Sequence, residues 1–502
     1  MTNIQATQVS SLNTLFSNNT DIIYFNELSY FNNLVFLKHT NRSTGEFENC
    51  TNLKEITLPI SITKLTGYSA FVNGGCFYHC SNLTKINLEN IETMEGGNVF
   101  NGCSSLTEIN MPKLTSVDAT DGWGGNMYYF YKCISIKYAN IPLLKILPNS
   151  FFEMCSSLES VTCDTITYLG AWCFVNDAKL TSLNISNCTI FKQECLKNTP
   201  LLTDITFNDN TELIEVDALD NNGWYNSQSN GLIRIGKVLY KYKGTAPENT
   251  SIVIPDDIVY ITEKCFINQS NIVSVTMNDT ITTLNSSTFR NCTSLKTIDL
   301  KNITTIPDGC FQSCSSLESI DLSKVINYNL WSERMFETCT SLKTVKLNTI
   351  LTDLTVVDGI FNKCTSLVDD INLENITKFG RENFSNCTSF KGTTIQFDKV
   401  SVILYNCFLY CSSFTQNLDL QKLVICEVGI FSHCSNLSSV HLYNVTKIDK
   451  FSFEYCTSLR YIRIDATTVP TLVDINSFDQ DTCNFYVLDD LVDSYKTAKS
   501  RR

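Results

Sequence analysis

One short sequence motif is repeated along most of this chain. Its clearest copy runs from Phe289 to Leu300 and reads FRNCTSLKTIDL, and the next copy runs from Phe311 to Leu322 and reads FQSCSSLESIDL. Both follow the pattern F-x-x-C-[ST]-[SN]-L-x-x-[IV]-x-L. Such an internal repeat decides the fold, because each copy is one structural unit that buries its apolar residues only by stacking on the next copy.

The first position of this motif, called here the Phe position, sets the period. Most steps from one copy to the next are 22 to 25 residues long. A period of about 20–29 residues with an L-x-x-I-x-L core is typical of leucine-rich repeats. We therefore expect a repeat solenoid, poor in helix: a right-handed superhelix of about 17 turns with one strand per turn, made mostly of β-strand and coil. The Phe position falls at Phe47, Phe77, Phe100, Phe130, Phe152, Phe174, Leu196, Phe266, Phe289, Phe311, Phe336, Phe361, Phe384, Phe408, Phe431, Phe453 and Phe478.

The strand of each turn is expected at the I-x-L end of the motif. Successive side chains of a strand point to opposite faces. In the first copy quoted above, Ile298 and Leu300 are therefore expected to point into the solenoid, and Asp299 is expected to point outward. Stacked turns then share one continuous apolar core.

The distribution of the copies divides the chain into five parts. Residues 1–46 carry no motif and are expected to form an N-terminal cap, residues 47–207 a first arm, residues 208–262 an interruption with a β-hairpin around Gly236, residues 263–484 a second arm, and residues 485–502 a C-terminal strand and capping helix. Two long repeats of the first arm hold Gly- and aromatic-rich insertions, at residues 66–75 and 118–129. Insertions in solenoids become loops, often on the binding face, although passive and merely tolerated loops would look the same.

The cysteines follow the repeat as well. Of the 23 cysteines, 13 stand at the C of the motif and six stand directly before the Phe position. A free cysteine packs as a small buried hydrophobic residue with a weak donor, so we expect a ladder of reduced core thiols. Two alternatives stay open, namely metal binding through pairs such as Cys76 and Cys80, and disulfides between neighbouring turns. No C-x2-C pair frames a zinc site, and neither a metal nor a cofactor is expected.

Charge and hydropathy exclude several classes of protein. The net charge is −13 and no long basic run is present, which argues against nucleic acid and anionic membranes as partners. No stretch approaches the roughly 18 apolar residues of a membrane-spanning helix. The start of the chain lacks the basic and apolar regions of a secretion signal. Only four histidines occur, and neither an H-E-x-x-H nor a G-x-S-x-G motif is present, so we expect no enzyme.

The outward position of the strand, x in I-x-L, is the best candidate for binding. In the first arm it holds only Asn and Thr, and in the second arm it is mixed in charge. Rows of short polar side chains suit hydrogen bonding to a glycan or an extended backbone, and loop aromatics can stack on sugars or anchor an interface. A merely solvated strand face, or rings buried in packing, would show the same residues. The predicted ligand-binding residues are Asn87, Asn110, Asn140, Asn184, Trp123, Tyr128, Trp224 and Tyr225.

Three stretches resemble the BspA-like (Treponema-type) leucine-rich repeat family. They are the motif itself, the segment GKVLYKYKG from Gly236 to Gly244, and the Y-V-x4-V-x2-Y-K ending from Tyr486 to Lys496. The resemblance covers roughly residues 47–500 and implies a leucine-rich repeat fold. Members of the family are surface or secreted binding proteins of bacteria and mucosal protists associated with adhesion, and related repeats occur in phage tail-associated proteins. This sequence departs from the family because most repeats lack the Pro after the strand and the Ile-Gly before Ala-Phe, and because the secretion signal is missing.

Two functions are compatible with these observations. The first is a non-enzymatic binding or adhesion protein that recognises a protein or glycan on a cell surface, as a single chain or as a homo-oligomer or larger assembly. The alternative is a bacteriophage virion component, tail-associated and either receptor-binding or structural. The alternative explains the missing signal and suits reduced thiols, because virions are assembled in the cytoplasm. The expected location is the cell surface or extracellular space in the first case and the virion in the second.

Overall fold

The computed structural model describes residues 16–34, 36–37, 45–67, 74–118, 126–328, 333–355, 357–478 and 483–500. The chain divides into two compact units within a hairpin formed by β16 (Gly231–Ile235) and β17 (Val238–Lys243). The first unit comprises Met1–Ser229 with Ile233–Val238, and the second comprises Asn230–Leu232 with Leu239–Arg502.

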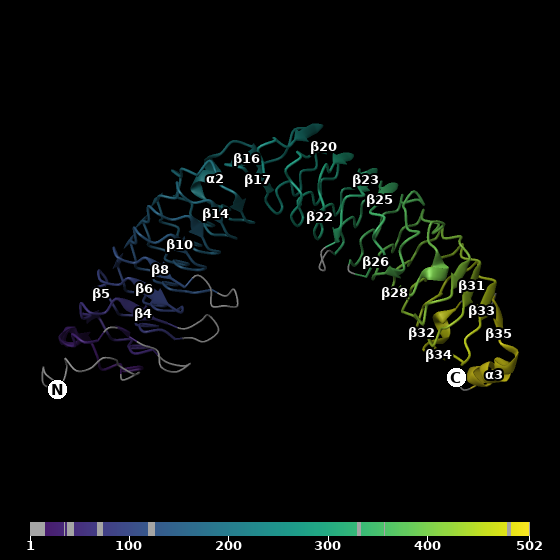
Figure 1. The fold of residues 1–502 in the computed structure, drawn as a ribbon, viewed down its shortest axis with the longest axis horizontal. Coiled ribbons are helices and arrows are strands. Elements are labelled where there is room, and N and C mark those ends of the chain that lie inside the picture. Colours follow the sequence, from purple (N-terminus) through teal and green to yellow (C-terminus); the bar gives the residue numbers. More distant parts are fainter. Residues whose placement is uncertain are drawn as a thin grey trace. The chain divides into compact units, whose positions relative to one another are not determined.

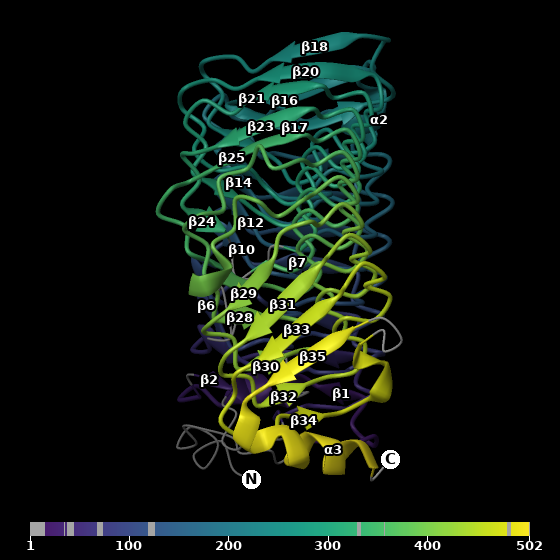
Figure 2. The ribbon, with the colours of Figure 1, turned by 90° about the vertical axis from the view of Figure 1, so that its right-hand side faces the viewer.

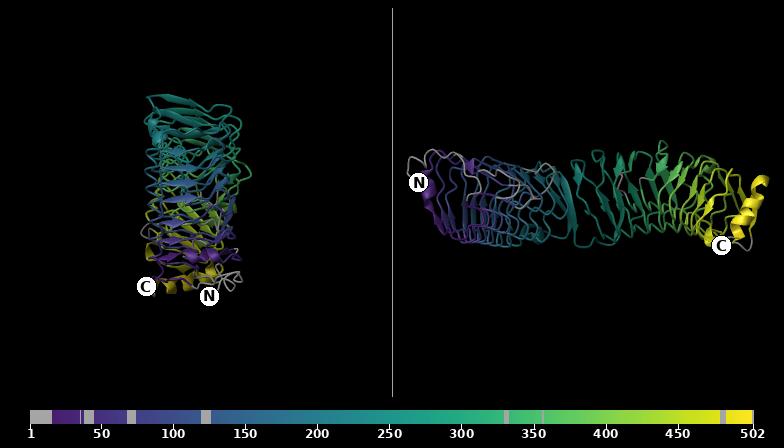
Figure 3. Two further views of the ribbon diagram at one scale, coloured as in Figure 1. Left: turned by 90° about the vertical axis from the view of Figure 1, so that its left-hand side faces the viewer. Right: turned by 90° about the horizontal axis from the view of Figure 1, so that it is seen from below.

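Most turns carry two short strands where the motif predicts one. The strand at the I-x-L end belongs to what we call the first ladder, and a second strand a few residues later belongs to the second ladder (Figures 1 and 3). Both ladders are parallel: β20 (Ile272–Thr276) pairs with β21 (Thr297–Asp299), and β22 (Thr305–Ile306) pairs with β24 (Asn327–Tyr328). The second strand forms because a further apolar residue, such as the fully buried Ile306, closes the core on the other side of the turn.

The first unit contains both ladders from its first described turn onward. The first ladder consists of β1 (Tyr24–Phe25), β3 (Glu55–Ile56), β5 (Lys85–Ile86), β7 (Glu108–Asn110), β9 (Tyr138–Asn140), β11 (Ser160–Thr162) and β13 (Ser182–Leu183). The second ladder consists of β2 (Phe36–Leu37), β4 (Lys64–Thr66), β6 (Thr93–Glu95), β8 (Ser116–Val117), β10 (Ile146–Leu147), β12 (Tyr168–Leu169), β14 (Ile190–Phe191) and β15 (Leu213–Ile214).

The second unit repeats this plan and ends on a helix. Figure 2 shows its last first-ladder strands side by side and the terminal helix α3 (Val492–Ser500) beyond them. Its first ladder holds β18 (Thr250–Val253), β20, β21, β23 (Ser319–Leu322), β25 (Thr344–Leu347), β29 (Leu418–Leu420), β31 (Ser439–Leu442), β33 (Tyr461–Ile464) and β35 (Asn484–Val487). Its second ladder holds β19 (Tyr260–Ile261), β22, β24, β26 (Asp353–Leu354), β27 (Lys378–Phe379), β28 (Val402–Ile403), β30 (Ile425–Cys426), β32 (Lys447–Ile448) and β34 (Thr471–Leu472).

The predicted fold class is confirmed. The chain is a leucine-rich repeat solenoid of about 16 turns, made of strand and coil with little helix. The helical segments are η1 (Asn26–Tyr30), α2 (Gly223–Ser227), η2 (Phe397–Lys399), η3 (Ile475–Ser477), η4 (Asp489–Leu491) and α3. The hairpin predicted around Gly236 and the strand and helix predicted at the C-terminal end are present as β16–β17, β35 and α3.

A column of phenylalanine rings runs through the interior of each unit. Rings at successive Phe positions lie 5.2–5.6 Å apart, centroid to centroid, from Phe47 to Phe174, and 5.1–5.8 Å apart from Phe266 to Phe478. These separations are favourable for aromatic pairs. Phe16 extends the first column, since its ring stacks on that of Phe47 at 5.3 Å. The described residues 16–34 and 36–37 therefore belong to a turn of the solenoid, although the sequence motif is not recognisable there.

The motif cysteines line up beside this column. Each of the 13 donates its Sγ–H to the backbone carbonyl of the Phe-position residue one turn earlier, at 2.9–3.2 Å. Twenty-two of the 23 cysteines are buried, all 23 are free thiols, and only Cys483 is partly exposed. Burial raises the pKa of the Cys50 thiol to about 11. The prediction of buried packing cysteines is confirmed, and the hydrogen bond explains why a small residue with a weak donor recurs there.

The stack continues where the motif fades. Leu219 takes the Phe position one turn after Leu196, and both are fully buried. Thr199 and Asn222 replace the cysteine in these two turns, and the Asn222 amide donates to the Thr199 hydroxyl at 2.8 Å. In the second unit, the extra residues before Ile371 and Ile395 leave two turns without a first-ladder strand between β25 and β29.

Candidate binding surfaces

The asparagines predicted to bind a ligand lie on the first ladder of the first unit. Asn87 turns toward the preceding turn, where its side chain accepts from the Leu58 N–H at 2.6 Å and donates to the Leu58 carbonyl at 3.0 Å. Asn140 donates to the side chain of Asn110 at 2.9 Å, and Asn184 donates to Asp164 at 3.0 Å. These hydrogen bonds join neighbouring turns. Part of the hydrogen-bonding capacity of the asparagine side chains is therefore already used within the protein.

The predicted aromatic residues that the structure describes do not lie on this row. Tyr128 lies in the segment leading to Phe130, where its hydroxyl accepts from Asn126 at 2.9 Å. Trp224 and Tyr225 belong to α2. The indole of Trp224 packs edge-on against the ring of Phe207, with the ring centroids 4.7 Å apart. Trp123 lies outside the described residues. Among the predicted residues that the structure describes, Asn110 and Asn140 are in direct contact through their side chains.

A different surface of the first unit is apolar. We define the apolar row as the outward residues of four consecutive second-ladder strands, which lie opposite one another in the parallel register. The residue that follows each member, namely Leu147, Leu169, Phe191 or Ile214, is fully buried, which fixes the outward direction of the row. In the three turns directly before the row, the outward residues on the same ladder are Lys64, Thr93 and Ser116. The members of the apolar row are Ile146, Tyr168, Ile190 and Leu213.

Polar residues border the apolar row on both sides. The residues directly before its members are Lys145, Thr167, Thr189 and Glu212. On the other side, Lys192 forms an ion pair with Glu215. An apolar centre with a polar border is the anatomy of a protein–protein interface. The predicted Gly-Trp insertion joins the described chain at Asp118, directly after β8, and β8 neighbours β10 of the row.

The outward face of the first ladder in the second unit is charged and internally paired. His441 lies 2.8 Å from Asp465, and the Arg463 guanidinium donates to both oxygens of Asp465 at 3.0 Å. The hydrogen bond from Arg463 lowers the pKa of Asp465. Lys346 lies 3.3 Å from Asp321 on neighbouring strands. Side chains that neutralise one another in this way leave little free charge for a ligand.

Comparison with known proteins agrees with the repeat geometry. A protein-family model described as "BspA type Leucine rich repeat region (6 copies)" matches residues 24–120, 126–245, 233–368 and 355–480. The chain belongs to this family. The predicted family resemblance is thereby confirmed. No curated protein matches the chain.

Several solved structures are similar to this BspA-type chain. A leucine-rich repeat protein from Bacteroides ovatus is 23% identical, with 71% of this chain and 87% of that chain covered and a TM-score of 0.40. A leucine rich cell surface protein from Faecalibacterium prausnitzii is 21% identical, with 67% and 78% covered and a TM-score of 0.30. The leucine-rich repeat protein of T. pallidum is 17% identical, with 46% and 87% covered and a TM-score of 0.22.

Two other kinds of site are absent from the described part of this BspA-type chain. Its described residues include no group of three or more His, Cys, Asp or Glu side chains that could hold a metal ion. Among the same residues, no helix has the length and hydropathy needed to cross a membrane.

Sequence reasoning missed the apolar row because the motif ends at I-x-L, before the second strand begins. The signal was nevertheless present. The segments KIL, TYL, TIF and ELI, ending at Leu147, Leu169, Phe191 and Ile214, each place two large apolar residues side by side. Since neighbouring residues of a strand face opposite ways, one member of each pair had to point outward.

Proposed function

We propose that this protein is a non-enzymatic binding scaffold that holds a protein partner against the apolar row of its first unit. The proposal is carried by the row itself, in which four large side chains share the outward position of four consecutive strands. A ladder face that meets only water is normally polar, as the three turns directly before the row are, with Lys64, Thr93 and Ser116. Removing apolar surface from water on binding contributes about 25 cal/mol per Å².

The chemistry of the row favours a protein over a glycan. Ile146, Ile190 and Leu213 have no hydrogen-bonding side-chain groups, whereas a sugar presents hydroxyl groups that need partners. The asparagines that could supply such partners are engaged between turns, as Asn87 is with Leu58. The polar border with Thr167 and Thr189 would surround a desolvated centre, which is where binding energy concentrates in protein interfaces. The ligand-binding residues proposed from the sequence, and the cell-surface and virion settings, stay predictions.

The test is a screen of the full-length protein against purified cell-surface and matrix proteins, with a glycan array in parallel. We expect at least one protein ligand, and we expect Ile190→Lys to weaken its binding by about tenfold or more, because an unpaired ammonium group would be desolvated at the centre of the contact. Thr93→Lys is the matched control, since it introduces the same charge at the same ladder position outside the row.

The two variants also separate binding from folding. Both substitutions are at outward positions, so both proteins should melt close to the wild type. Binding that is unaffected by Ile190→Lys contradicts the proposal, and so does a protein that binds only glycans.

A further inference from the structure

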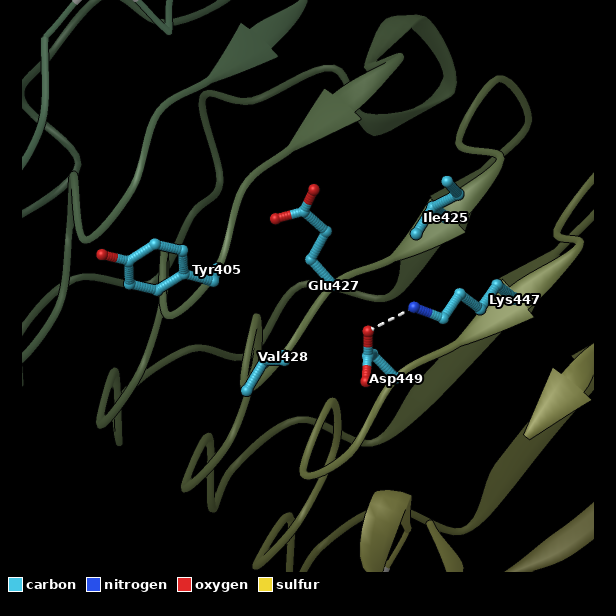
Figure 4. A pocket seen from close by; sticks show the side chains of 6 residues that line it. All are labelled: Tyr405, Ile425, Glu427, Val428, Lys447 and Asp449. Carbon is cyan, nitrogen blue, oxygen red and sulfur yellow. Dashed lines mark hydrogen bonds and ion pairs between the residues drawn. The ribbon is translucent and has the colours of Figure 1, made fainter. Parts of the chain in front are cut away.

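The second unit has a pocket of about 360 Å³ on the side of its second ladder. It lies where the chain leaves three neighbouring turns, those of β28, β30 and β32. Figure 4 shows its lining residues, which combine an aromatic ring, two aliphatic side chains and three charged groups. They are Tyr405, Ile425, Glu427, Val428, Lys447 and Asp449.

The positive charges in and beside this pocket are already matched. The Lys447 ammonium lies 2.7 Å from an Asp449 carboxylate oxygen, and the hydrogen bond from Lys447 lowers the pKa of Asp449. The Arg381 guanidinium lies 5.3 Å from the centre of the Tyr405 ring, and it also lies 3.7 Å from Asp358.

Glu427 is the exception among the charged groups of the pocket. Its carboxylate has no ion pair and no side-chain hydrogen bond with any described residue, and the interaction drawn in Figure 4 joins Lys447 to Asp449 instead. Glu427 is half-buried, so its charge is screened less than that of a fully exposed carboxylate. The pocket therefore presents one uncompensated negative charge.

The remaining walls are apolar and accessible. Ile425 is 43% exposed and Tyr405 is 37% exposed, although both are large apolar side chains on a ladder surface. Val428 is half-buried next to Glu427. A carboxylate flanked by an aliphatic and an aromatic surface matches a side chain with a cationic head and a methylene stem.

We propose that this pocket receives one arginine or lysine side chain of a partner protein, with the cationic head at Glu427 and the methylene stem against Ile425 and Val428. The Tyr405 ring, which already has the Arg381 guanidinium 5.3 Å from its centre, adds an apolar wall for the stem. The net charge of −13 attracts cationic partners to the chain as a whole, and the pocket gives that attraction a specific position. This site goes beyond the proposed function, since it lies in the other unit and does not depend on the apolar row.

The test measures binding of acetylated and amidated glycine-rich pentapeptides to the full-length protein by isothermal titration calorimetry or saturation-transfer NMR. Their central residue is arginine, lysine, citrulline or norleucine. We expect the arginine and lysine peptides to bind, and the uncharged peptides to bind about tenfold more weakly or not at all. Raising the salt concentration should weaken binding of the cationic peptides. The ratio of arginine to lysine affinity shows which cation the pocket prefers.

Glu427→Gln keeps the shape of the pocket and removes its free charge. It should reduce cationic peptide affinity by about tenfold. Glu374→Gln, which removes an exposed carboxylate of the same unit, is the control and should bind as the wild type does. Ile425→Ser should also weaken binding without changing the charge. The proposal is overturned if no cationic peptide binds, if citrulline binds as well as arginine, or if Glu427→Gln and Glu374→Gln behave alike. Because the assay needs no ligand of the first unit, its outcome is independent of the test of the apolar row.

Discussion

In the first unit, the outward positions of the second ladder are apolar in four consecutive turns. In the second unit, the equivalent positions are mixed: Val402 and Ile425 are apolar, whereas Lys378 pairs with Asp353 at 3.0 Å and Lys447 pairs with Asp449. The interiors show no such divergence. Phe rings stack at 5.2–5.6 Å in the first unit and at 5.1–5.8 Å in the second. The motif therefore determines the inside of each turn and leaves the outside free to differ, so recognition has to be sought at positions outside the motif.

Buried carboxyl groups form a second contrast. In the first unit, Glu46 and Asp177 are fully buried, and their carboxyl oxygens make no hydrogen bond to another described residue. In the second unit, the buried Glu337 accepts a hydrogen bond from Gln312 at 2.6 Å and lies 3.7 Å from the Lys363 ammonium. A buried carboxyl group without a partner favours its neutral form, so the stability of the first unit should depend more strongly on pH.

Glu46→Gln should have the largest effect on this contrast. Burial raises the pKa of Glu46 from an ordinary 4.5 to about 8. The unfolded chain loses this proton near the ordinary pKa, while the folded chain keeps it, so the free energy of unfolding falls as pH rises from about 4.5 to about 8. The variant removes this loss, which amounts to about 1.4 kcal/mol per pH unit and at most about 5 kcal/mol.

The measurement for Glu46→Gln is hydrogen exchange of first-unit amides across a pH series. The exposed Glu92→Gln in the same unit is the control and should follow the wild type. A stability gain for Glu46→Gln that is equally large at pH values below 4.5 would show that the buried charge is not the cause.

The claim of equivalent interiors is tested by Leu158→Ala in the first unit and Leu295→Ala in the second. Both leucines occupy the same motif position and are fully buried. Each substitution should lower the stability of its own unit by about 2–5 kcal/mol, because it leaves a cavity. The exposed Asp299→Ala should change stability by only about 0.5 kcal/mol. Denaturant unfolding with local exchange probes measures these effects, and clearly unequal costs for the two leucines would mean that the interiors differ.

The sequence predicted the interior well and the surface poorly, for a physical reason. Positions such as Phe311 and Cys314 each tolerate few residue types, because each must fit a ring or a thiol between two turns, and the period is therefore visible in the sequence. Leu219 and Asn222 fill the Phe and Cys positions of their turn with other side chains. The motif is therefore not visible in the sequence of that turn. Outward positions carry no such constraint, and the contact of Asn87 with a backbone one turn away could not be read from a pattern.

Asp177 is a departure from the motif that should lower the stability of the first unit. It takes the place of a motif cysteine one turn after Cys155, and burial raises its pKa well above the ordinary value. Asp177→Cys should restore the thiol-to-carbonyl hydrogen bond seen at the other motif cysteines and raise stability at neutral pH by about 1–3 kcal/mol. Since the unfolded chain binds the proton less tightly than the folded chain, the gain should shrink as pH falls toward the ordinary pKa of an aspartate. Thermal unfolding at several pH values is the measurement, and a gain that does not depend on pH would contradict this explanation.

The smallest expected effects distinguish structural from ligand-binding asparagines on the first ladder. Asn87→Ala removes two hydrogen bonds to the half-enclosed Leu58 backbone and should lower stability by about 1–2 kcal/mol. Asn110→Ala removes only an exposed contact with Asn140 and should change stability by at most about 0.5 kcal/mol. Thermal melts give both values, and the binding assay of the apolar row gives a second readout on the same proteins. If Asn110→Ala leaves the melt unchanged but abolishes partner binding, the first ladder is the recognition surface after all. If neither variant affects binding while Asn87→Ala alone is destabilised, the asparagine row serves to join turns, and recognition belongs to the second ladder.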